Sequence, residues 1–462
     1  MRYQTEFGNE EQEDDGFWFD FGRAVALLWV MSITPLPAGK IAPAIHLAIA
    51  AIFASLVCAQ AADAPIRIVK CGEQVRSKKR GVCENHMSAE DFKALAPGVS
   101  WYYNWNYTTD DVPPDGVHMD YYPQVWGHDS DIDGLATFLS THKARFVLAL
   151  NEPNLKDQAF ITPEAAADFY KKVKVIADKY GIPVVGPNMS LGSPANGSIT
   201  AMDPIDNKQV TYTFMIPYLK AFYHFMGDVP IPAAVFHTYG NIGELKWATG
   251  EMYKQFQKPV WVTEFAWWNA PSPVESVKYL IKATDFFERT PYVAGYSFFK
   301  ERASNNSTNI SLLKPAPAPP GELTPLGKVY VSMPVHDADL YYRLPGKLQA
   351  GYYVGAVNSD IELTDDRDGS GNFDMTGVGP GTLDYNIQVD KAGTYKIALR
   401  VSDLGQPMQI EEGGKVLGQT GPTVAGWQTL EVSVPLPAGP HVLRIHTGGQ
   451  TVHWIEFSQK SD

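Results

Sequence analysis

Short apolar runs alternate with segments of helical periodicity from residue 80 to about residue 332, and this alternation constrains the fold more than any other feature of the chain. Parallel strands need a crossover connection, usually a helix, so the alternation predicts a parallel sheet. Eight such units over about 250 residues predict a (β/α)8 barrel. The eight predicted strands are Arg80–Cys83, Val99–Tyr103, Pro123–Trp126, Arg145–Leu150, Pro183–Gly186, Ala233–Phe236, Val260–Thr263 and Gly295–Phe299.

The connecting segments carry helix start and stop signals. Thr162 is a capping residue, Pro163 suits the first helical turn, and Gly181 suits the position after the last turn. The predicted helices are Thr162–Tyr180, Thr213–Met226, Gly243–Phe256, Ser272–Arg289 and, after the eighth strand, Leu323–Tyr330.

The sequence pattern changes after residue 345, from alternating strands and helices to strands alone. Period-two strands separated by Gly-rich turns and lacking helices predict a β-sandwich of the jelly-roll kind. These strands are Leu383–Val389, Gly393–Val401, Trp427–Val434 and His441–Ile445. We therefore predict a catalytic domain over 62–333, which includes the Pro-rich stretch 314–320, a linker over 334–345 and a second domain over 346–462.

Residues 1–61 form an N-terminal extension with an apolar stretch at 41–61. Ala59-Gln60-Ala61 has the small-x-small form of a signal-peptidase site, which predicts a secreted, periplasmic or cell-surface protein whose mature chain starts at Ala62. The acidic run at 10–15 does not suit a signal peptide, so Met31 is the better start. The alternative is an uncleaved membrane anchor, because the stretch is nearly long enough to span a bilayer.

The composition excludes some partners. The net charge of −13 argues against nucleic acid and anionic membrane surfaces. Aromatic residues make up 12% of the chain, which suits either sugar stacking or a large core. Cys71 and Cys83 form an even pair in an exported chain, so they are candidates for one disulfide, with two reduced thiols as the alternative.

Two carboxylates end the fourth and seventh predicted strands. Glu152 follows the run that ends at Leu150, and Glu264 directly follows Thr263. These strands lie across the barrel mouth from each other, where catalytic residues of such barrels sit. Two facing carboxylates fit glycoside hydrolysis with one acid/base and one nucleophile, and Asn151 is placed to hydrogen-bond a sugar 2-hydroxyl.

Polar and aromatic side chains at other strand ends are candidates for sugar contacts. Sugar rings present apolar C–H faces on which aromatic rings can stack, although core packing is the alternative for each ring. The candidates are Asn104, Trp105, Trp126, Trp267, Trp268 and Phe298.

Residues 78–332 resemble the family 128 glycoside hydrolases of clan A, which act on β-1,3-glucans. The resemblance is carried, in the family's order, by Lys79–Gly81, Ser100–Trp105, Leu150–Pro153, Phe236–Gly240, Val262–Ala266 and Leu323–Gly327. It implies that Glu152 is the acid/base, Glu264 the nucleophile and Asn151 the helper. It also implies that Tyr239 hydrogen-bonds the nucleophile with His237 beside it in the cleft, and that catalysis needs no cofactor or metal.

The C-terminal region, about 346–459, resembles family 6 and family 35 carbohydrate-binding modules. The matching stretches are Asp368–Asn372, Leu383–Ile387, Lys391–Tyr395, Gly426–Thr429, Leu436–Gly439 and Trp454–Phe457. Such modules carry a structural calcium, partly through acidic residues on the first strand, but Leu348–Tyr353 has no acidic residue here. We expect Trp427 to be a core residue.

The resulting hypothesis is a monomeric, retaining endo-β-1,3-glucanase that binds β-1,3-glucan polysaccharide or oligosaccharide. Alternatives are a clan A hydrolase of another β-glucan or of mannan, a transglycosylase with the same residues, and a non-catalytic glucan-binding protein. The choice between endo and exo action depends on loops that the sequence does not define.

Overall fold

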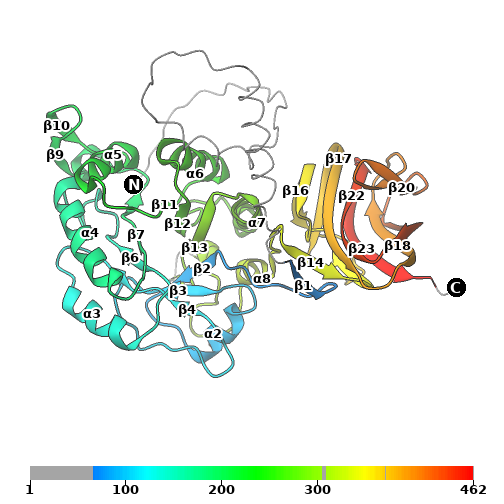
Figure 1. Ribbon diagram of the computed structural model, residues 1–462, viewed down its shortest axis with the longest axis horizontal. Coiled ribbons are helices and arrows are strands. Elements are labelled where there is room, and N and C mark those ends of the chain that lie inside the picture. Colours follow the sequence, from blue (N-terminus) through cyan, green and yellow to red (C-terminus); the bar gives the residue numbers. More distant parts are fainter. Residues whose placement is uncertain (1–65, 304–307, 370, 461–462) are drawn as a thin grey trace, which may run out of the picture. The chain divides into compact units, whose positions relative to one another are not determined.

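A computed structural model describes residues 66–303, 308–369 and 371–460, and strands alternate with helices from β2 to α8 (Figure 1). A strand lies in each of the eight predicted segments: β2 (Arg80–Cys83), β3 (Trp101–Tyr103), β5 (Gln124–Val125), β6 (Val147–Ala149), β7 (Val184–Val185), β11 (Ala234–Thr238), β12 (Val260–Phe265) and β13 (Val293–Phe298). The helices are α2 (Ala89–Leu95), α3 (Ile132–Thr141), α4 (Pro163–Asp178), α5 (Met215–Met226), α6 (Ile242–Phe256), α7 (Pro273–Arg289) and α8 (Pro325–Ser332).

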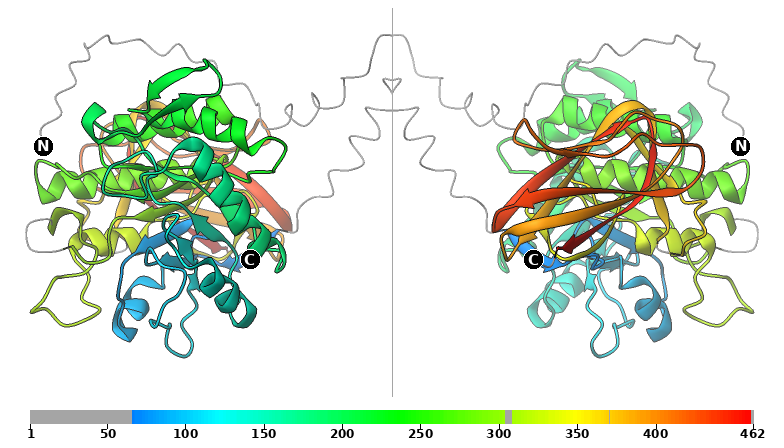
Figure 2. Two further views of the ribbon diagram at one scale, coloured as in Figure 1. Left: turned by 90° about the vertical axis from the view of Figure 1, so that its left-hand side faces the viewer. Right: turned by 90° about the vertical axis from the view of Figure 1, so that its right-hand side faces the viewer.

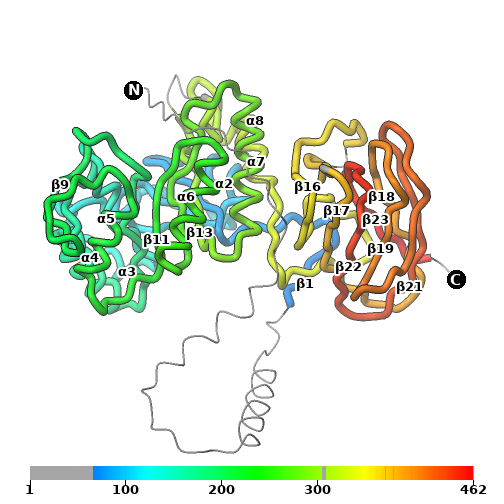
Figure 3. The backbone as a smooth tube through the Cα atoms, turned by 90° about the horizontal axis from the view of Figure 1, so that it is seen from above, coloured from blue at the N-terminus to red at the C-terminus, as the bar shows by residue number. Residues whose placement is uncertain are grey.

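The strands of this domain are parallel and form a barrel-like arrangement with helices on its outside (Figures 1 and 3). With β4 (Asp120–Tyr121) and β8 (Asn188–Ser190), they pair in the orders β4-β3-β2-β13-β12-β11-β8 and β5-β6-β7. Backbone bonds continue between the two groups: Glu152 N, after β6, donates to Asn188 O on β8, and Gln124 N on β5 donates to Asn106 O, which follows β3. The carboxyl ends of the strands therefore meet at one mouth. After β8 the chain forms an antiparallel hairpin of β9 (Thr200–Asp203) and β10 (Lys208–Thr211).

The helices begin where the capping signals predict. The hydroxyl of Thr162 accepts a hydrogen bond from the N–H of Ala165, and Pro163 is the first residue of α4. Ser272 before α7 and Thr324 before α8 cap in the same way, each followed by a proline. Each cap satisfies one of the backbone donors that a helix start leaves without a partner.

A fully buried ion pair fixes the start of β2 in the core. The guanidinium of Arg80 lies 2.9 Å from Glu288 on α7 and donates to the hydroxyl of Tyr296 on β13 at 2.9 Å. It also donates to the carbonyl oxygens of Tyr330 and Met333. A buried charge is tolerated when it is paired and its donors are satisfied, and this network meets both conditions.

The chain after α8 is all β, and Figure 2 shows these strands in yellow to red. The central strands pair antiparallel in the order β20-β19-β22-β17-β23-β18-β21. Along β18, Ile397 and Leu399 are buried while their neighbour Lys396 is partly exposed, as period-two alternation requires. The strands are β14 (Leu340–Arg343), β15 (Gly346–Gln349), β16 (Gly355–Leu363), β17 (Phe373–Val389), β18 (Gly393–Ser402), β19 (Gln409–Glu412), β20 (Lys415–Gln419), β21 (Gln428–Leu436), β22 (Gly439–Gly448) and β23 (Thr451–Gln459).

Two segments differ from their predicted roles. The stretch 334–345, predicted as a linker, contains β14. β1 (Arg67–Lys70), predicted as part of the catalytic domain, pairs parallel with β14 in the sheet of the C-terminal domain. A four-residue strand has too little local pattern to show which distant strand it joins, so the sequence does not reveal this pairing.

The predicted disulfide between Cys71 and Cys83 is wrong, because both are free thiols. Cys71 follows β1 in the C-terminal sheet, whereas Cys83 ends β2 in the catalytic domain, where its Sγ lies 3.4 Å from the carbonyl oxygen of Phe298. Burial raises the pKa of Cys71 to about 12, so this thiol stays protonated at neutral pH.

Three further expectations concern the termini and calcium. The signal peptide and the membrane anchor both lie outside the described residues. Within the part of the chain that the structure describes, no helix combines the length and apolarity that crossing a membrane requires. The residues from Gly346 in β15 to Tyr353 include no carboxylate, so they do not fit the calcium site that the resemblance implies.

Candidate active site

Two buried glutamates lie at the carboxyl ends of β6 and β12. Glu152 follows β6 and is 7% exposed, and Glu264, the next-to-last residue of β12, is 4% exposed. The backbone of Leu150 (φ 59°) and of Glu152 (φ 45°) is in the left-handed region, which costs a non-glycine residue about 1–3 kcal/mol. The bond from Glu152 N to Asn188 O at 2.7 Å holds this turn and aims the carboxylate across the mouth.

His237 at the end of β11 bridges the two carboxylates. Its Nδ1 lies 3.1 Å from Glu152 Oε1 and 3.5 Å from Glu264 Oε2. Both distances start from one atom, so the two oxygens are no farther apart than the sum of the two. That limit reaches only the lower end of the spacing in inverting glycosidases, about 6.5–9.5 Å, and it allows the retaining spacing of about 5–5.5 Å.

Glu264 accepts hydrogen bonds on both carboxylate oxygens. Trp105 Nε1 donates to Oε1 at 2.7 Å, Tyr103 OH donates to the same oxygen at 3.1 Å, and Tyr239 OH donates to Oε2. Burial, followed by the charge of Glu264, raises the pKa of Tyr239 well above its ordinary value, so the phenol stays protonated and remains a donor. Three donors hold the carboxylate in one orientation and stabilise its charged form.

A chain of hydrogen bonds fixes the tautomer of His237. The amide nitrogen of Asn188 donates to the carbonyl oxygens of Ala149 and Leu150, so its Oδ1 faces the hydroxyl of Thr263 and accepts from it at 2.8 Å. The Thr263 oxygen is therefore an acceptor for His237 Nε2, 3.0 Å away. His237 carries a proton on Nε2, and its Nδ1 is left to exchange a proton with the carboxylates.

Charge interactions couple His237 to both glutamates. Burial lowers the pKa of His237, but the carboxylates of Glu264 and Glu152 raise it by more, so its pKa lies above the ordinary value. Burial raises the pKa of Glu264; His237 opposes this shift and Glu152 adds to it. His237 Nδ1 and Glu152 Oε1 lie within hydrogen-bond distance at 3.1 Å, so a proton can pass between them, as general acid/base catalysis requires.

A cavity of about 310 Å³ opens above these groups. Asn151 is 4% exposed; its amide nitrogen donates to Gln158 Oε1 at 2.9 Å, and its Oδ1 has no hydrogen-bond partner among the described residues. A buried amide oxygen without a partner is costly unless a ligand supplies the donor, and a sugar hydroxyl would do so. The lining residues are Asn85, Trp105, Trp126, Asn151, Glu152, Gln158, Tyr239, Glu264, Phe299 and Lys300.

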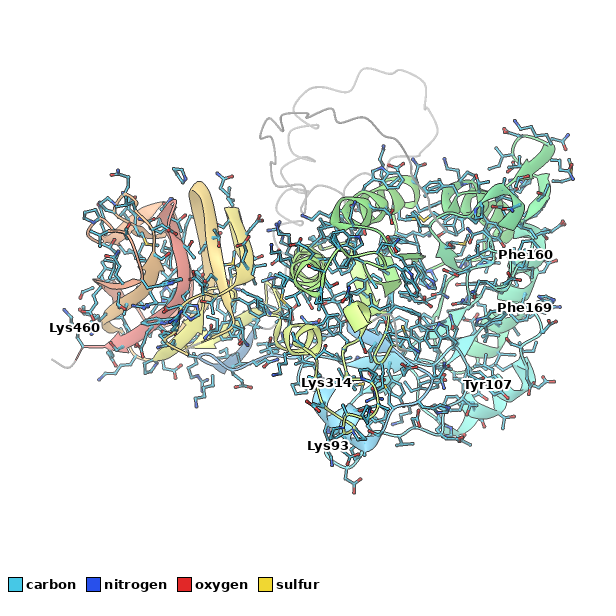
Figure 4. The ribbon with its side chains drawn as sticks, turned by 180° about the vertical axis from the view of Figure 1, so that it is seen from behind. Lys93, Tyr107, Phe160, Phe169, Lys314 and Lys460 are labelled. Atoms are coloured by element: carbon cyan, nitrogen blue, oxygen red, sulfur yellow. The ribbon has the colours of Figure 1, made fainter. Side chains whose placement is uncertain are left out.

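Of the predicted aromatic contacts, the structure brings Trp105 and Trp126 to the cavity. Trp268 is 51% exposed, with its ring centroid 5.9 Å from that of Tyr239, so it extends the aromatic surface at the edge of the cavity. Figure 4 labels Tyr107 on the loop that follows β3 and Phe160 on the loop that follows β6.

Three predicted contacts lie elsewhere. Asn104 organises its own loop, because its side chain accepts from Tyr121 OH and donates to Thr108 O. Trp267 does not line the cavity, and its ring packs near Tyr279.

Phe298 is the third, because it is 1% exposed and packs in the core. The next residue, Phe299, lines the cavity instead. Successive side chains of a strand point to opposite faces, so an error of one residue exchanges the core for the cleft.

Several residues at the site are absent from the predicted set. Tyr103, Thr263 and Asn188 act through hydrogen bonds to Glu264 and His237, and none of them lines the cavity. Their position at strand ends is the only signal that the sequence offers. His237, predicted as a sugar contact, is 1% exposed and touches both carboxylates, so it positions them.

The geometry describes a pair of carboxylates for glycoside hydrolysis, and the comparisons agree. The model of the family "Glycosyl hydrolase catalytic core" matches residues 81–330, more than half of the chain. The chain therefore belongs to the glycosyl hydrolase catalytic core family and is a glycoside hydrolase. No curated protein matches the chain.

The chain is also similar to two solved enzymes of family 128, subgroup II. The chain is 32% identical to an endo-β-1,3-glucanase from Sorangium cellulosum and 30% identical to one from Pseudomonas viridiflava. Each match covers 56% of this chain and 100% of the other, with a TM-score of 0.47. A subgroup I endo-β-1,3-glucanase from Amycolatopsis mediterranei, in complex with laminarihexaose, is 19% identical over 55% of this chain and 99% of that one, with a TM-score of 0.43.

Proposed function

We propose that this protein hydrolyses β-1,3-glucan with retention of configuration, with Glu264 as nucleophile and Glu152 as acid/base. One observation carries the proposal: Glu152 and Glu264 both contact Nδ1 of His237 beneath a cavity, at a separation that suits a retaining pair. The substrate class rests on the identity to two endo-β-1,3-glucanases over their whole length.

The steps follow from the hydrogen bonds. The carboxylate of Glu264, which accepts hydrogen bonds from three donors, attacks the anomeric carbon, while Glu152 gives a proton to the departing glycosidic oxygen. Glu152 then takes a proton from a water molecule, which releases the sugar from Glu264. Asn151 Oδ1 accepts from the 2-hydroxyl, a contact that strengthens in the transition state.

The test compares polymers and variants. The purified chain is incubated with laminarin, with a β-1,4-glucan and with a β-mannan, and reducing ends are measured. We expect release from laminarin only, no release by Glu264→Ala, and normal release by Glu164→Ala, which removes an exposed glutamate of α4. NMR of the first product should show the β-anomer.

Other results would change the proposal in defined ways. Release from another polymer would replace the substrate and leave the mechanism. An α-anomeric first product would overturn retention. Binding of laminarin without hydrolysis would favour the alternative of a glucan-binding protein. Products of mixed length would indicate endo action, and one small product exo action.

The finer architecture and the location are also proposals. We propose that the catalytic domain is a complete (β/α)8 barrel, that the C-terminal domain is a jelly-roll carbohydrate-binding module, and that the protein is exported as a monomer. Trp427, expected in the core, is only partly buried: its Nε1 donates to Asp365, its ring contacts Arg400 and His453, and its exposed part is the candidate for a sugar contact. Affinity electrophoresis in laminarin gels, with Trp427→Ala as the variant, tests the module. N-terminal sequencing of the exported protein tests cleavage at Ala62.

A further inference from the structure

A lysine at the edge of the catalytic cavity takes no part in the proposed steps. Lys300 follows β13 and lines the cavity together with Phe299, the residue before it. Its Nζ lies 3.0 Å from Glu84 Oε1, and its side chain is 22% exposed. Glu84 follows β2, the strand that pairs with β13, so the two residues come from neighbouring strand ends at the mouth. An ammonium group therefore lies where a bound sugar would be.

Glu84 is itself held in place by hydrogen bonds from the backbone. Its Oε1 accepts from the N–H of Asn85 at 2.8 Å, and its Oε2 accepts from the N–H of Arg302 at 3.1 Å. The guanidinium of Arg302 in turn donates to Asp91, at 2.8 and 3.4 Å. Because both carboxylate oxygens already have backbone donors, burial of Glu84 does not require the lysine. Glu84 is therefore a fixed support for the ammonium group.

The ammonium group of Lys300 has hydrogen-bond donors left for a ligand. An ammonium carries three N–H donors, and among the described residues Glu84 is the one side chain that accepts from it. The charge of Lys300 is paired with that of Glu84, so the group offers donors to the cavity without a net positive charge. This combination favours an uncharged ligand that is rich in hydroxyl groups, whose oxygens accept hydrogen bonds.

Lys300 lies on the nucleophile's side of the cavity. β13 is the neighbour of β12, which carries Glu264. The ring of Phe299 packs edge to face against those of Tyr239 and Trp105, at centroid distances of 5.4 and 5.9 Å. Both of these residues donate hydrogen bonds to Glu264. A sugar bonded to the nucleophile would therefore have the aromatic ring of Phe299 and the donors of Lys300 beside it.

We propose that Lys300 donates a hydrogen bond to a hydroxyl group of the sugar on the nucleophile's side of the scissile bond, and that Glu84 positions Lys300 for this contact. The contact rests on the proposed function, because it requires a glucan in the cavity. A hydroxyl group of the sugar keeps its position while the glycosidic bond breaks, so the contact stabilises the bound substrate and the transition state alike. Its loss should therefore raise KM and leave kcat nearly unchanged.

Steady-state kinetics on laminarin test the contact. Lys300→Met keeps most of the length of the side chain and removes the ammonium group, and KM should rise about 10–100-fold, as expected for the loss of a charged donor. Lys174→Met is the matched control, because the side chain of Lys174 on α4 is 20% exposed and pairs with Asp178 at 2.7 Å. Its KM should not change. An unchanged KM in Lys300→Met, or a loss confined to kcat, would overturn the proposal.

A double-mutant cycle tests the positioning role of Glu84. Glu84→Gln should raise KM in the unmodified chain, and it should have no further effect on KM in the Lys300→Met background, because both substitutions remove the same contact. The Tm of each variant is measured alongside. If Glu84→Gln lowers Tm and raises KM by the same factor in both backgrounds, Glu84 has only a structural role and its positioning of Lys300 is refuted.

Binding measurements separate the contact from the proposed hydrolysis. Laminarihexaose is titrated calorimetrically into Glu264→Ala and into the double variant with Lys300→Met. A Kd that is about 10–100-fold weaker in the double variant supports the contact, even if the unmodified chain hydrolyses no laminarin, which would refute only the proposed activity. Equal Kd values would overturn the contact and leave the activity standing. If Glu264→Ala binds no laminarihexaose, the contact is overturned as well, because no glucan then occupies the cavity.

Discussion

The hydroxyl of Tyr239 is the feature whose removal should report most directly on the nucleophile. Tyr239→Phe keeps the ring and removes one of the three donors to Glu264, while Trp105 and Tyr103 remain on the other oxygen. A hydrogen bond to a charged group contributes about 1.5–3 kcal/mol, and one pKa unit corresponds to 1.36 kcal/mol. The lost donor stabilised the ionised form, so the pKa of Glu264 should rise by about 1–2 units.

The assay is the pH profile of kcat/KM on laminarin. Activity requires ionised Glu264, so the acidic limb should move to higher pH by about 1–2 units in Tyr239→Phe. Tyr218→Phe is the control, because Tyr218 is fully buried and donates only to the carbonyl oxygen of Ile161, at 2.7 Å. That variant should lose about 1 kcal/mol of stability with an unchanged limb. A uniform loss of rate with an unmoved limb in Tyr239→Phe would refute the electrostatic role of the hydroxyl.

Three further predictions concern single side chains. Asn151→Ala should lower kcat/KM about 10–100-fold without changing Tm, because it removes an acceptor for the 2-hydroxyl; an unchanged rate would show that this oxygen contacts no sugar. Glu288→Gln should lower the free energy of unfolding by about 3–5 kcal/mol in urea titrations, because Arg80 stays buried without its counter-charge; a loss under about 1 kcal/mol would contradict this. Phe299→Ala should raise KM with nearly constant stability, because Phe299 lines the cavity. Phe298→Ala should lower the free energy of unfolding by about 3–5 kcal/mol, because Phe298 is in the core. The reverse pattern would mean that the two side chains face the opposite way.

Much of the fold is readable from local pattern. Each of the eight predicted strand segments contains a strand, and the helix after the fourth strand begins at Pro163 behind its Thr162 cap. Local sequence pattern did not predict which sheet a short strand joins or whether two cysteines meet, because both depend on residues far away in the sequence. β1 belongs to the C-terminal sheet through its pairing with β14, and Cys71 goes with it, away from Cys83.

The two catalytic glutamates could be predicted from the sequence for a geometric reason. In a parallel sheet every strand ends at the same edge, so an acidic residue after an apolar run is at the mouth whatever the details of packing. The residues that tune the pair are not marked in this way. Asn188, Thr263 and His237 come from different strands and meet only because those strands are neighbours in space.

The sequence by itself determined the alternating architecture of the catalytic domain, the all-β character of the C-terminal region, and the identity of the two carboxylates, because periodicity, capping and strand ends are local properties. Only the tertiary structure decided which neighbour of a pair faces the cleft, as with Phe298 and Phe299, and which nitrogen of His237 carries the fixed proton. It also brought Asp368 and Asp374 to the two ring nitrogens of His453. Directional contacts between residues far apart in sequence depend on how whole strands pack, and no local pattern records that packing.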